Sequence, residues 1–233
     1  ILRKPISVQY ITPSLKLQLL FEKMGYRLET VRRYGDVPRL FLASLPADLQ
    51  QIQQPRERKI LFIKMALPLI LHANEMILWD RKIILKLLDK SRVGKTVSSG
   101  EQAWLNKKAQ EYGLAELNLA ELVRRVDGIP PSLALAQAAE ESGWGTSRFA
   151  REGNSIFGQR TWRGGRSIKP TRREAGETFR VRAYHRLIDG IMSYTRNLNG
   201  HFAYDEFRRA RELQRRLGGG LDGYNLVGNL KRY

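Results

Sequence analysis

The sequence predicts an α+β fold that is mainly helical, with one small β-hairpin and an N-terminal helical region. Most apolar residues recur at helical spacing, and only the stretch around residue 180 alternates apolar and basic residues as a half-buried strand does. A chain of 233 residues with 42% hydrophobic content can bury a substantial core, so we expect one or two domains. A polar, glycine-containing linker at 91–100 divides the chain into an N-terminal helical region, 1–95, and a second domain, 96–233.

The N-terminal region is dominated by residues 56–90, which are apolar and helical in period. Its most apolar part, 60–71, contains Pro68 and is too short to span a bilayer. We therefore predict a buried core helix bent near Pro68 and a second helix over 81–90. We also hypothesise that the region 1–95 is a separable regulatory or docking part, which covers a functional cleft of the second domain or docks a regulatory protein.

Several further helices are predicted in the second domain. Ser99 and Gln102 form a capping box that opens one helix, and Asn118 opens another that ends near residue 128. After the hairpin, the apolar positions 187, 191, 194 and 198 share one helix face, and residues 203–217 form the last long helix.

The most informative stretch, 129–145, predicts a short helix that carries a carboxylate on its apolar side and ends at glycine beside a tryptophan. Ala138 and Ala134 lie one and two turns before Glu141, and Trp144 lies three residues after it. Low polarity disfavours the charged form, so we expect a raised pKa there, and a protonated acid is what cleavage of a glycosidic bond needs. Glu140 also has apolar neighbours at helical spacing, so periodicity alone does not choose between the two glutamates.

Two motifs carry a family resemblance. The run Ala-Gln-Ala-Ala-Glu-Glu-Ser-Gly-Trp-Gly ends at residue 145, and Asn-Ser-Ile-Phe-Gly follows at 154–158. This pair resembles the glucosaminidase domain of bacterial cell-wall hydrolases, glycoside hydrolase family 73, with its flagellum-associated and autolysin-type members. Residues 193–204 resemble the Bax-like branch more closely, and the whole resemblance covers roughly 125–233. It implies a lysozyme-like domain that hydrolyses the β-1,4 bond after N-acetylglucosamine in peptidoglycan.

The resemblance also implies roles for particular residues. The family's general acid is the glutamate directly before Ser-Gly-Trp-Gly, which is Glu141, whereas Glu140 stands where relatives usually carry an apolar residue. A second acidic residue is expected on the hairpin, whose arms are 167–173 and 178–184 and whose carboxylates are Glu174 and Glu177. Tyr204 matches a tyrosine that lines the family's cleft.

The chemistry leaves alternatives open. Glu141 would protonate the glycosidic oxygen, while a second carboxylate, or the acetamido oxygen of the substrate, would support the oxocarbenium-like sugar. The sequence does not choose between retention and inversion. A lytic transglycosylase, which forms a cyclic anhydro sugar and needs no second carboxylate, is the nearest alternative.

Five residues are predicted to bind substrate because aromatic faces pack against the C–H faces of sugars or because they belong to the second motif. They are Trp144, Asn154, Phe157, Gly158 and Trp162. For Trp144 and Phe157 a core position is an equal alternative.

The charge balance indicates an anionic partner. The chain has 41 Lys plus Arg against 23 Asp plus Glu, a net charge of +18, which attracts wall polymer, anionic membrane or nucleic acid. No nucleic-acid signature accompanies these cations, so we expect peptidoglycan strands and no specific nucleic acid as the partner. A non-catalytic basic module, with salt-sensitive binding and indifference to loss of Glu141, is the rival from another class.

Residue usage argues against metal and disulfide chemistry. There is no cysteine, and His72, His185 and His201 lack paired helical spacing, so we expect no metal and no cofactor. We predict a packing or capping role for His201. The sequence begins at Ile1 without a signal-like segment, so we expect any export signal to have been removed or left out, and a periplasmic or cell-envelope location. The helical pattern at 230–233 predicts that the protein continues.

Overall fold

The structure is a computed structural model that describes residues 6–8, 13–162, 164–171, 176–218 and 220–230. The described residues are mostly helical with little strand, so the predicted mainly helical α+β class is confirmed. They form two compact units, one from residues 1–72 with 134–192 and the other from 73–133 with 193–233. These units differ from the consecutive domains predicted, 1–95 and 96–233, because each takes residues from both of those ranges.

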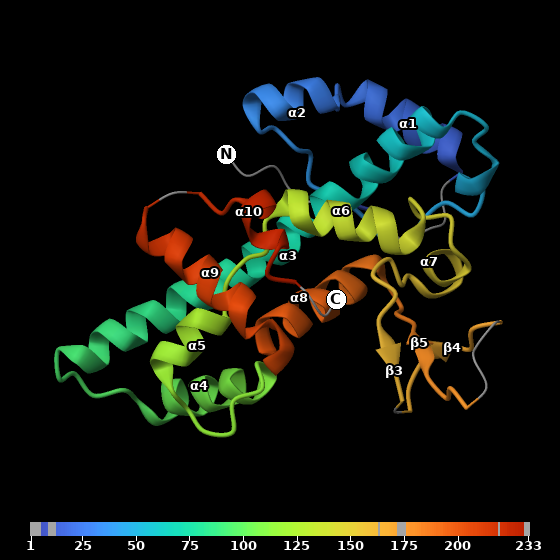
Figure 1. Cartoon of the computed structure of the whole chain (residues 1–233). Helices are drawn as coiled ribbons and strands as arrows, with labels where there is room; N and C mark the ends of the chain where they lie inside the picture. Colours follow the sequence, from blue (N-terminus) through green and yellow to red (C-terminus); the bar gives the residue numbers. More distant parts are fainter. Residues whose placement is uncertain (1–5, 9–12, 163, 172–175, 219, 231–233) are drawn as a thin grey trace. The chain divides into compact units, whose positions relative to one another are not determined.

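The first unit contains two short sheets and several helices. Its elements are β1 (Ile6–Val8), α1 (Ser14–Lys23), α2 (Leu28–Tyr34), β2 (Leu40–Leu42), η1 (Leu49–Gln51), α7 (Arg148–Gly153), β3 (Arg160–Thr161), β4 (Ser167–Ile168) and β5 (Arg180–Arg182). β1 and β2 pair in parallel with Ile6 opposite Leu40, so the N-terminal region is not purely helical as predicted. The second sheet is antiparallel, in the order β3-β5-β4, and Figure 1 labels its strands.

The second unit contains the remaining short helices. They are α4 (Ser99–Glu111), α5 (Leu119–Arg125), η2 (Phe202–Tyr204), α9 (Asp205–Arg216) and α10 (Gly223–Val227). Three helices supply residues to both units, namely α3 (Pro55–Arg92), α6 (Pro131–Ser142) and α8 (Leu187–Gly200). The helix predicted over 203–217 is therefore a 3-10 turn followed by α9, and the pattern at 231–233 lies outside the described residues.

Helix α3 corrects the prediction of two helices in the N-terminal region. It runs for 38 residues without interruption and contains Pro68, because residues 72–80 include no glycine or proline that would end it. Its buried side chains include Phe62, Met65 and Ile77. By length and composition α3 could cross a membrane, but 56% of its most apolar window is buried inside the protein. We interpret α3 as a core helix, as predicted.

Local sequence signals explain where the other helices begin. The capping box of α4 uses Ser98 and Glu101, one residue earlier than predicted: the Ser98 hydroxyl accepts from the Glu101 N–H and the Glu101 carboxylate accepts from the Ser98 N–H. Asn118 caps α5 as predicted, by accepting from the N–H of Glu121.

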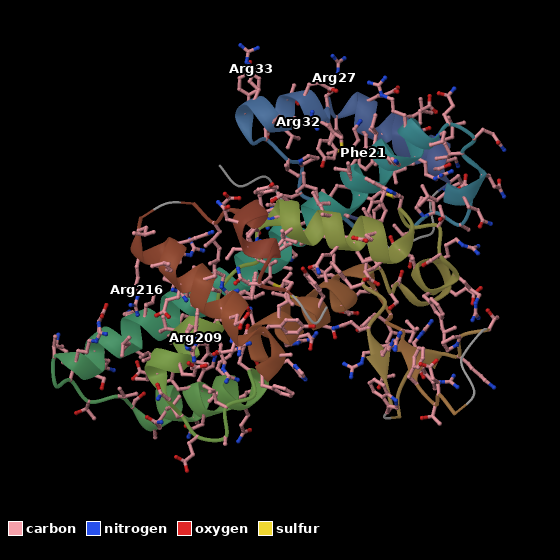
Figure 2. All side chains as sticks on the ribbon, viewed as in Figure 1. Phe21, Arg27, Arg32, Arg33, Arg209 and Arg216 are labelled. Atoms are coloured by element: carbon pink, nitrogen blue, oxygen red, sulfur yellow. The ribbon has the colours of Figure 1, made fainter. Side chains whose placement is uncertain are left out.

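Apolar contacts hold α1 to its surroundings in the first unit. Phe21, labelled in Figure 2, is fully buried. Its ring meets the ring of Tyr26 edge-on, with ring centroids 5.3 Å apart. In α8, the four positions predicted to share one face are all buried: Leu187, Ile191, Tyr194 and Leu198. The periodicity of this segment therefore identified its inward face.

Candidate active site

Glu141 lies in the last turn of α6, where the helix leaves the apolar core. Ala138 and Ala134, one and two turns earlier, are buried, whereas Glu141 itself is exposed. Within the described part of the chain, no side chain forms a hydrogen bond or an ion pair with its carboxylate. A carboxylate left unpartnered at a helix end is free to act on a bound molecule.

The turn after α6 is built from three successive residues in the left-handed region. The φ angles of Gly143, Trp144 and Gly145 are +56°, +58° and +79°. The Trp144 N–H closes the helix by donating to the carbonyl of Ala139 at 2.8 Å, and the Ser142 hydroxyl accepts from the Gly145 N–H at 2.8 Å. The left-handed conformation costs a residue with a side chain about 1–2 kcal/mol, so the packing around Trp144 has to stabilise this turn.

The N-terminal residues of the same unit supply that packing. A Cβ placed on Gly145 would lie 2.9 Å from the side chains of both Leu49 and Phe62. The ring of Trp144 meets Phe62 edge-on at 6.1 Å, and the Lys59 ammonium lies 4.9 Å from the Trp144 ring centroid. Residues of the predicted N-terminal region therefore pack against the turn and support it. Trp144 takes part in this packing, which is the alternative to the substrate-binding role predicted for it.

The surroundings of Glu141 favour its protonated form. Partial burial of the carboxyl group raises its pKa, the neighbouring Glu140 raises it further, and Arg160 opposes the shift. Gly158, with φ +57°, lies against the carboxylate, since a Cβ placed there would be 3.1 Å from Glu141 Oε2. A glycine at this position leaves room for the acid and for a molecule bound beside it.

The second motif positions Gly158. Asn154 ends α7 in the left-handed conformation, and its side-chain amide donates to the carbonyls of His185 at 3.0 Å and Tyr184 at 3.3 Å. Phe157 is buried. The hydrogen bonds of Asn154 and the burial of Phe157 fix the loop that brings Gly158 to Glu141.

The hairpin predicted after this loop is confirmed, because its two arms pair as antiparallel strands. β4 and β5 are antiparallel with Ser167 opposite Arg182, and the unpredicted β3 adds a third strand on the other side of β5. Trp162 is 70% exposed and lies 6.4 Å from the ring of Phe179, so its face is open to a sugar. Glu177 is half-buried just before β5, and Glu174 lies outside the described residues.

Tyr204 and His201 belong to the second unit. Tyr204 is buried, which raises its pKa, and a hydrogen bond with the Asn197 side chain partly offsets the shift. The His201 ring caps η2 by accepting from the Ala203 N–H at 3.2 Å, so its predicted capping role is confirmed. Among the described residues, no group of three or more His, Cys, Asp and Glu side chains could hold a metal ion.

Exposed cations are spread over both units, as the sequence indicated. Figure 2 labels Arg27, Arg32 and Arg33 at α2 and Arg209 and Arg216 on α9. Arg209 and Arg216 pair with Asp205 and Glu212 on their own helix. Sequence reasoning missed Arg160, which begins β3 and acts on Glu141. Its position two residues after Gly158 was the available signal.

Comparison with known protein families identifies the class of protein to which this chain belongs. The family described as "Mannosyl-glycoprotein endo-beta-N-acetylglucosaminidase" matches residues 117–225, a range that includes Glu141, both motifs and Tyr204. The chain therefore carries a glucosaminidase domain and is a glycoside hydrolase with a lysozyme-like α+β domain.

The relatives then define the branch. Protein bax of Escherichia coli (strain K12) is 30% identical over 197 residues, which are 82% of this chain and 68% of that protein. Peptidoglycan hydrolase FlgJ of the same strain is 40% identical over 88 residues, or 34% of this chain and 28% of FlgJ. FlgJ of Salmonella typhimurium (strain LT2) is 34% identical over 114 residues, or 45% of this chain and 35% of that protein. The chain belongs to the Bax-like family of glucosaminidases. No solved structure was found to match it.

Proposed function

We propose that this chain hydrolyses peptidoglycan, cleaving the β-1,4 bond after N-acetylglucosamine with Glu141 as the general acid. The observation that carries the proposal is the unpartnered Glu141 carboxyl with its raised pKa, directly before the Ser-Gly-Trp-Gly turn. Relatives named peptidoglycan hydrolase support the substrate class. They also support action in the cell envelope.

Glu141 would begin the reaction by giving its proton to the glycosidic oxygen, which is a poor leaving group until it is protonated. Partial burial and the charge on Glu140 keep that proton bound at a higher pH than usual for a glutamate. The sugar then develops oxocarbenium character. Trp162, which is exposed and belongs to the same unit as Glu141, offers a platform for the sugar ring.

For the second role we propose a hairpin carboxylate, Glu177 or Glu174, which would activate water or stabilise the cation. The acetamido oxygen of the substrate is the alternative. Glu174→Gln and Glu177→Gln separate the two routes. If the carboxylate acts, one variant loses about a hundredfold or more in turnover; if the acetamido group acts, both variants keep turnover near the wild-type value.

The experiment that tests the function is digestion of purified peptidoglycan, followed by borohydride reduction and mass spectrometry of the products. New reducing N-acetylglucosamine ends support the proposal. Anhydro-muramic ends identify a lytic transglycosylase instead. Salt-sensitive binding without any cleavage, equal in wild type and Glu141→Gln, identifies a non-catalytic basic module.

A further inference from the structure

The three-stranded sheet next to Glu141 carries an unusual set of cations. Among the described residues on or beside its strands, these are basic: Arg160, Arg166, Lys169, Arg180 and Arg182. None of them forms an ion pair with another described residue. Elsewhere, Arg209, Arg215 and Arg216 each pair with a carboxylate. Unpaired cations beside an acid that acts on a polymer point to anions on that polymer.

Among the five, Arg160 has the position closest in the chain to the acid. It begins β3 two residues after Gly158, the residue that lies against Glu141 Oε2. In the sheet it is opposite Val181, whereas Arg180 and Arg182 alternate with Val181 and so project to the other face. Arg160 thus differs from its basic neighbours in the face that it occupies.

The guanidinium of Arg160 is held before any ligand arrives. Its central carbon lies 4.2 Å from the centroid of the Phe179 ring, which is a stacking distance. A planar guanidinium fixed on an aromatic face keeps its N–H donors free at the edge, in the geometry that receives a carboxylate in two hydrogen bonds.

We propose that Arg160 is a specificity-determining residue that binds a carboxylate of the glycan strand beside Glu141. The inference rests on the proposed function and deepens it by naming the substrate class, which is an acidic rather than a neutral N-acetylated glycan. Peptidoglycan has two sources of such carboxylates, the stem peptides and the lactyl ethers that remain when the peptides are removed.

Substrate binding at Arg160 has a consequence for the acid. Among the described residues, the charged groups that act on Glu141 are Glu140 on α6 and Arg160 on β3, and of these two Arg160 lowers its pKa. A carboxylate bound to Arg160 neutralises that influence. Glu141 therefore keeps its proton to a higher pH when the strand is acidic than when it is neutral.

The test compares three soluble substrates with one protein. They are glycan strands that carry peptides, strands stripped of peptides, and stripped strands whose lactyl carboxylates have been converted to methylamides. The wild type is expected to cleave the two acidic substrates with kcat/KM about tenfold above the neutral one. A preference that needs the peptides identifies stem-peptide carboxylates, and a preference that persists without them identifies the lactyl groups.

Two variants make the assignment to Arg160 specific. Arg160→Gln is expected to lose the about tenfold preference, so that it cleaves acidic and neutral strands with equal kcat/KM. Arg182→Gln, an equal charge change on the other face of the sheet, should keep the preference. The basic limb of the kcat profile should lie at higher pH with acidic strands in the wild type, by less than about one unit, and should not differ between substrates in Arg160→Gln.

Other results would overturn the inference. Equal cleavage of acidic and neutral strands by the wild type contradicts it and leaves the proposed function intact. Equal losses in Arg160→Gln and Arg182→Gln assign the effect to diffuse charge. If no strand is cleaved, the proposed function fails, and binding decides the inference: stripped strands should bind Glu141→Gln more tightly than the variant that also carries Arg160→Gln.

Discussion

Two carboxylates in this protein, Glu141 and Asp127, have opposite surroundings. Glu141 is exposed, has no hydrogen-bond or ion-pair partner within the described residues, and has a raised pKa. Asp127 is buried in the second unit, where it pairs with Arg215 at 2.8 Å and lies near Arg81 and Arg211. Burial favours a higher pKa for Asp127, but the three arginines outweigh it and hold that pKa below its usual value.

The difference separates the carboxylate for which we propose a catalytic role from a structural one. Asp127 and Arg211 connect distant segments, since Arg211 also donates to the carbonyls of Asp127 and Gly128 and to the side chain of Asn199. Around Glu141, no described cation forms an ion pair with the carboxylate. A cation in contact with a carboxylate lowers its pKa, so its absence helps a carboxyl group to keep a proton that it can donate.

Replacing Glu141 gives the largest expected effect. Glu141→Gln removes the proposed proton donor and should lower turnover of peptidoglycan about 10²- to 10⁴-fold. Glu140→Gln is the matched control on the adjacent residue and should stay within about threefold of wild type, since Glu140 acts on the acid only through its charge. Rates are measured as reducing ends released. A Glu140→Gln variant as inactive as Glu141→Gln would remove the distinction between the two glutamates.

Replacing Asp127 should affect stability instead. Asp127→Asn leaves the buried Arg211, together with Arg81 and Arg215, without a counter-charge and should lower the free energy of unfolding by about 3–5 kcal/mol. Glu212→Gln, which breaks an exposed pair on the same helix as Arg215, should cost less than about 1 kcal/mol. Urea denaturation measures both. Equal losses in the two variants would mean that the Asp127 cluster is not a special structural site.

The packing of Leu49 and Phe62 against the turn at residues 143–145 gives the next prediction. Gly145→Ala combines a positive φ with overlap against Leu49 and Phe62, and should destabilise the protein by about 2–4 kcal/mol. Gly25→Ala has a similar φ of +65° but no neighbour within 4 Å, so strain alone should cost about 1 kcal/mol. Urea denaturation of both variants gives the two losses. Equal losses would show that the N-terminal residues do not support the turn.

The pH dependence of stability should have opposite signs at the two carboxylates. Asp127, whose folded pKa is lowered, contributes stability above its unfolded pKa near 3.8, and this is lost as pH falls through the folded pKa. Glu141, whose folded pKa is raised, contributes fully below about 4.5, and this is lost as pH rises through the folded pKa. Activity should fall over the same upper range.

Unfolding of the wild type and Glu141→Gln across pH measures the Glu141 contribution. The variant should gain stability relative to the wild type as pH rises above about 4.5. A constant difference between the two proteins across this range would contradict a raised pKa.

Local signals predicted much of this structure. Helical spacing identified the buried face of α8, the glycines marked the end of α6, and the alternation around residue 180 located β5. The parallel pairing of β1 with β2 was missed because each strand has three residues and the partners are far apart in the sequence. Two-residue β3 carries no periodicity at all.

The sequence predicted which residues form the candidate site, but it did not predict the contacts between them. The two motifs named Glu141 and Gly158, but nothing in their spacing indicated that the glycine lies against the carboxylate. The Asp127 cluster escaped prediction for the same reason, since Asp127 and Arg215 are 88 positions apart. Such pairs depend on how distant segments fold together and leave no periodic pattern.

Carbon-13 NMR titration of the side-chain carboxyl carbons in the wild-type protein tests the contrast between Glu141 and Asp127 most directly. We expect Glu141 to titrate above the usual glutamate value of 4.5 and Asp127 below the usual aspartate value of 3.8. A Glu141 carboxyl that titrates at or below 4.5 would contradict the claim that the fold holds this residue as a proton donor.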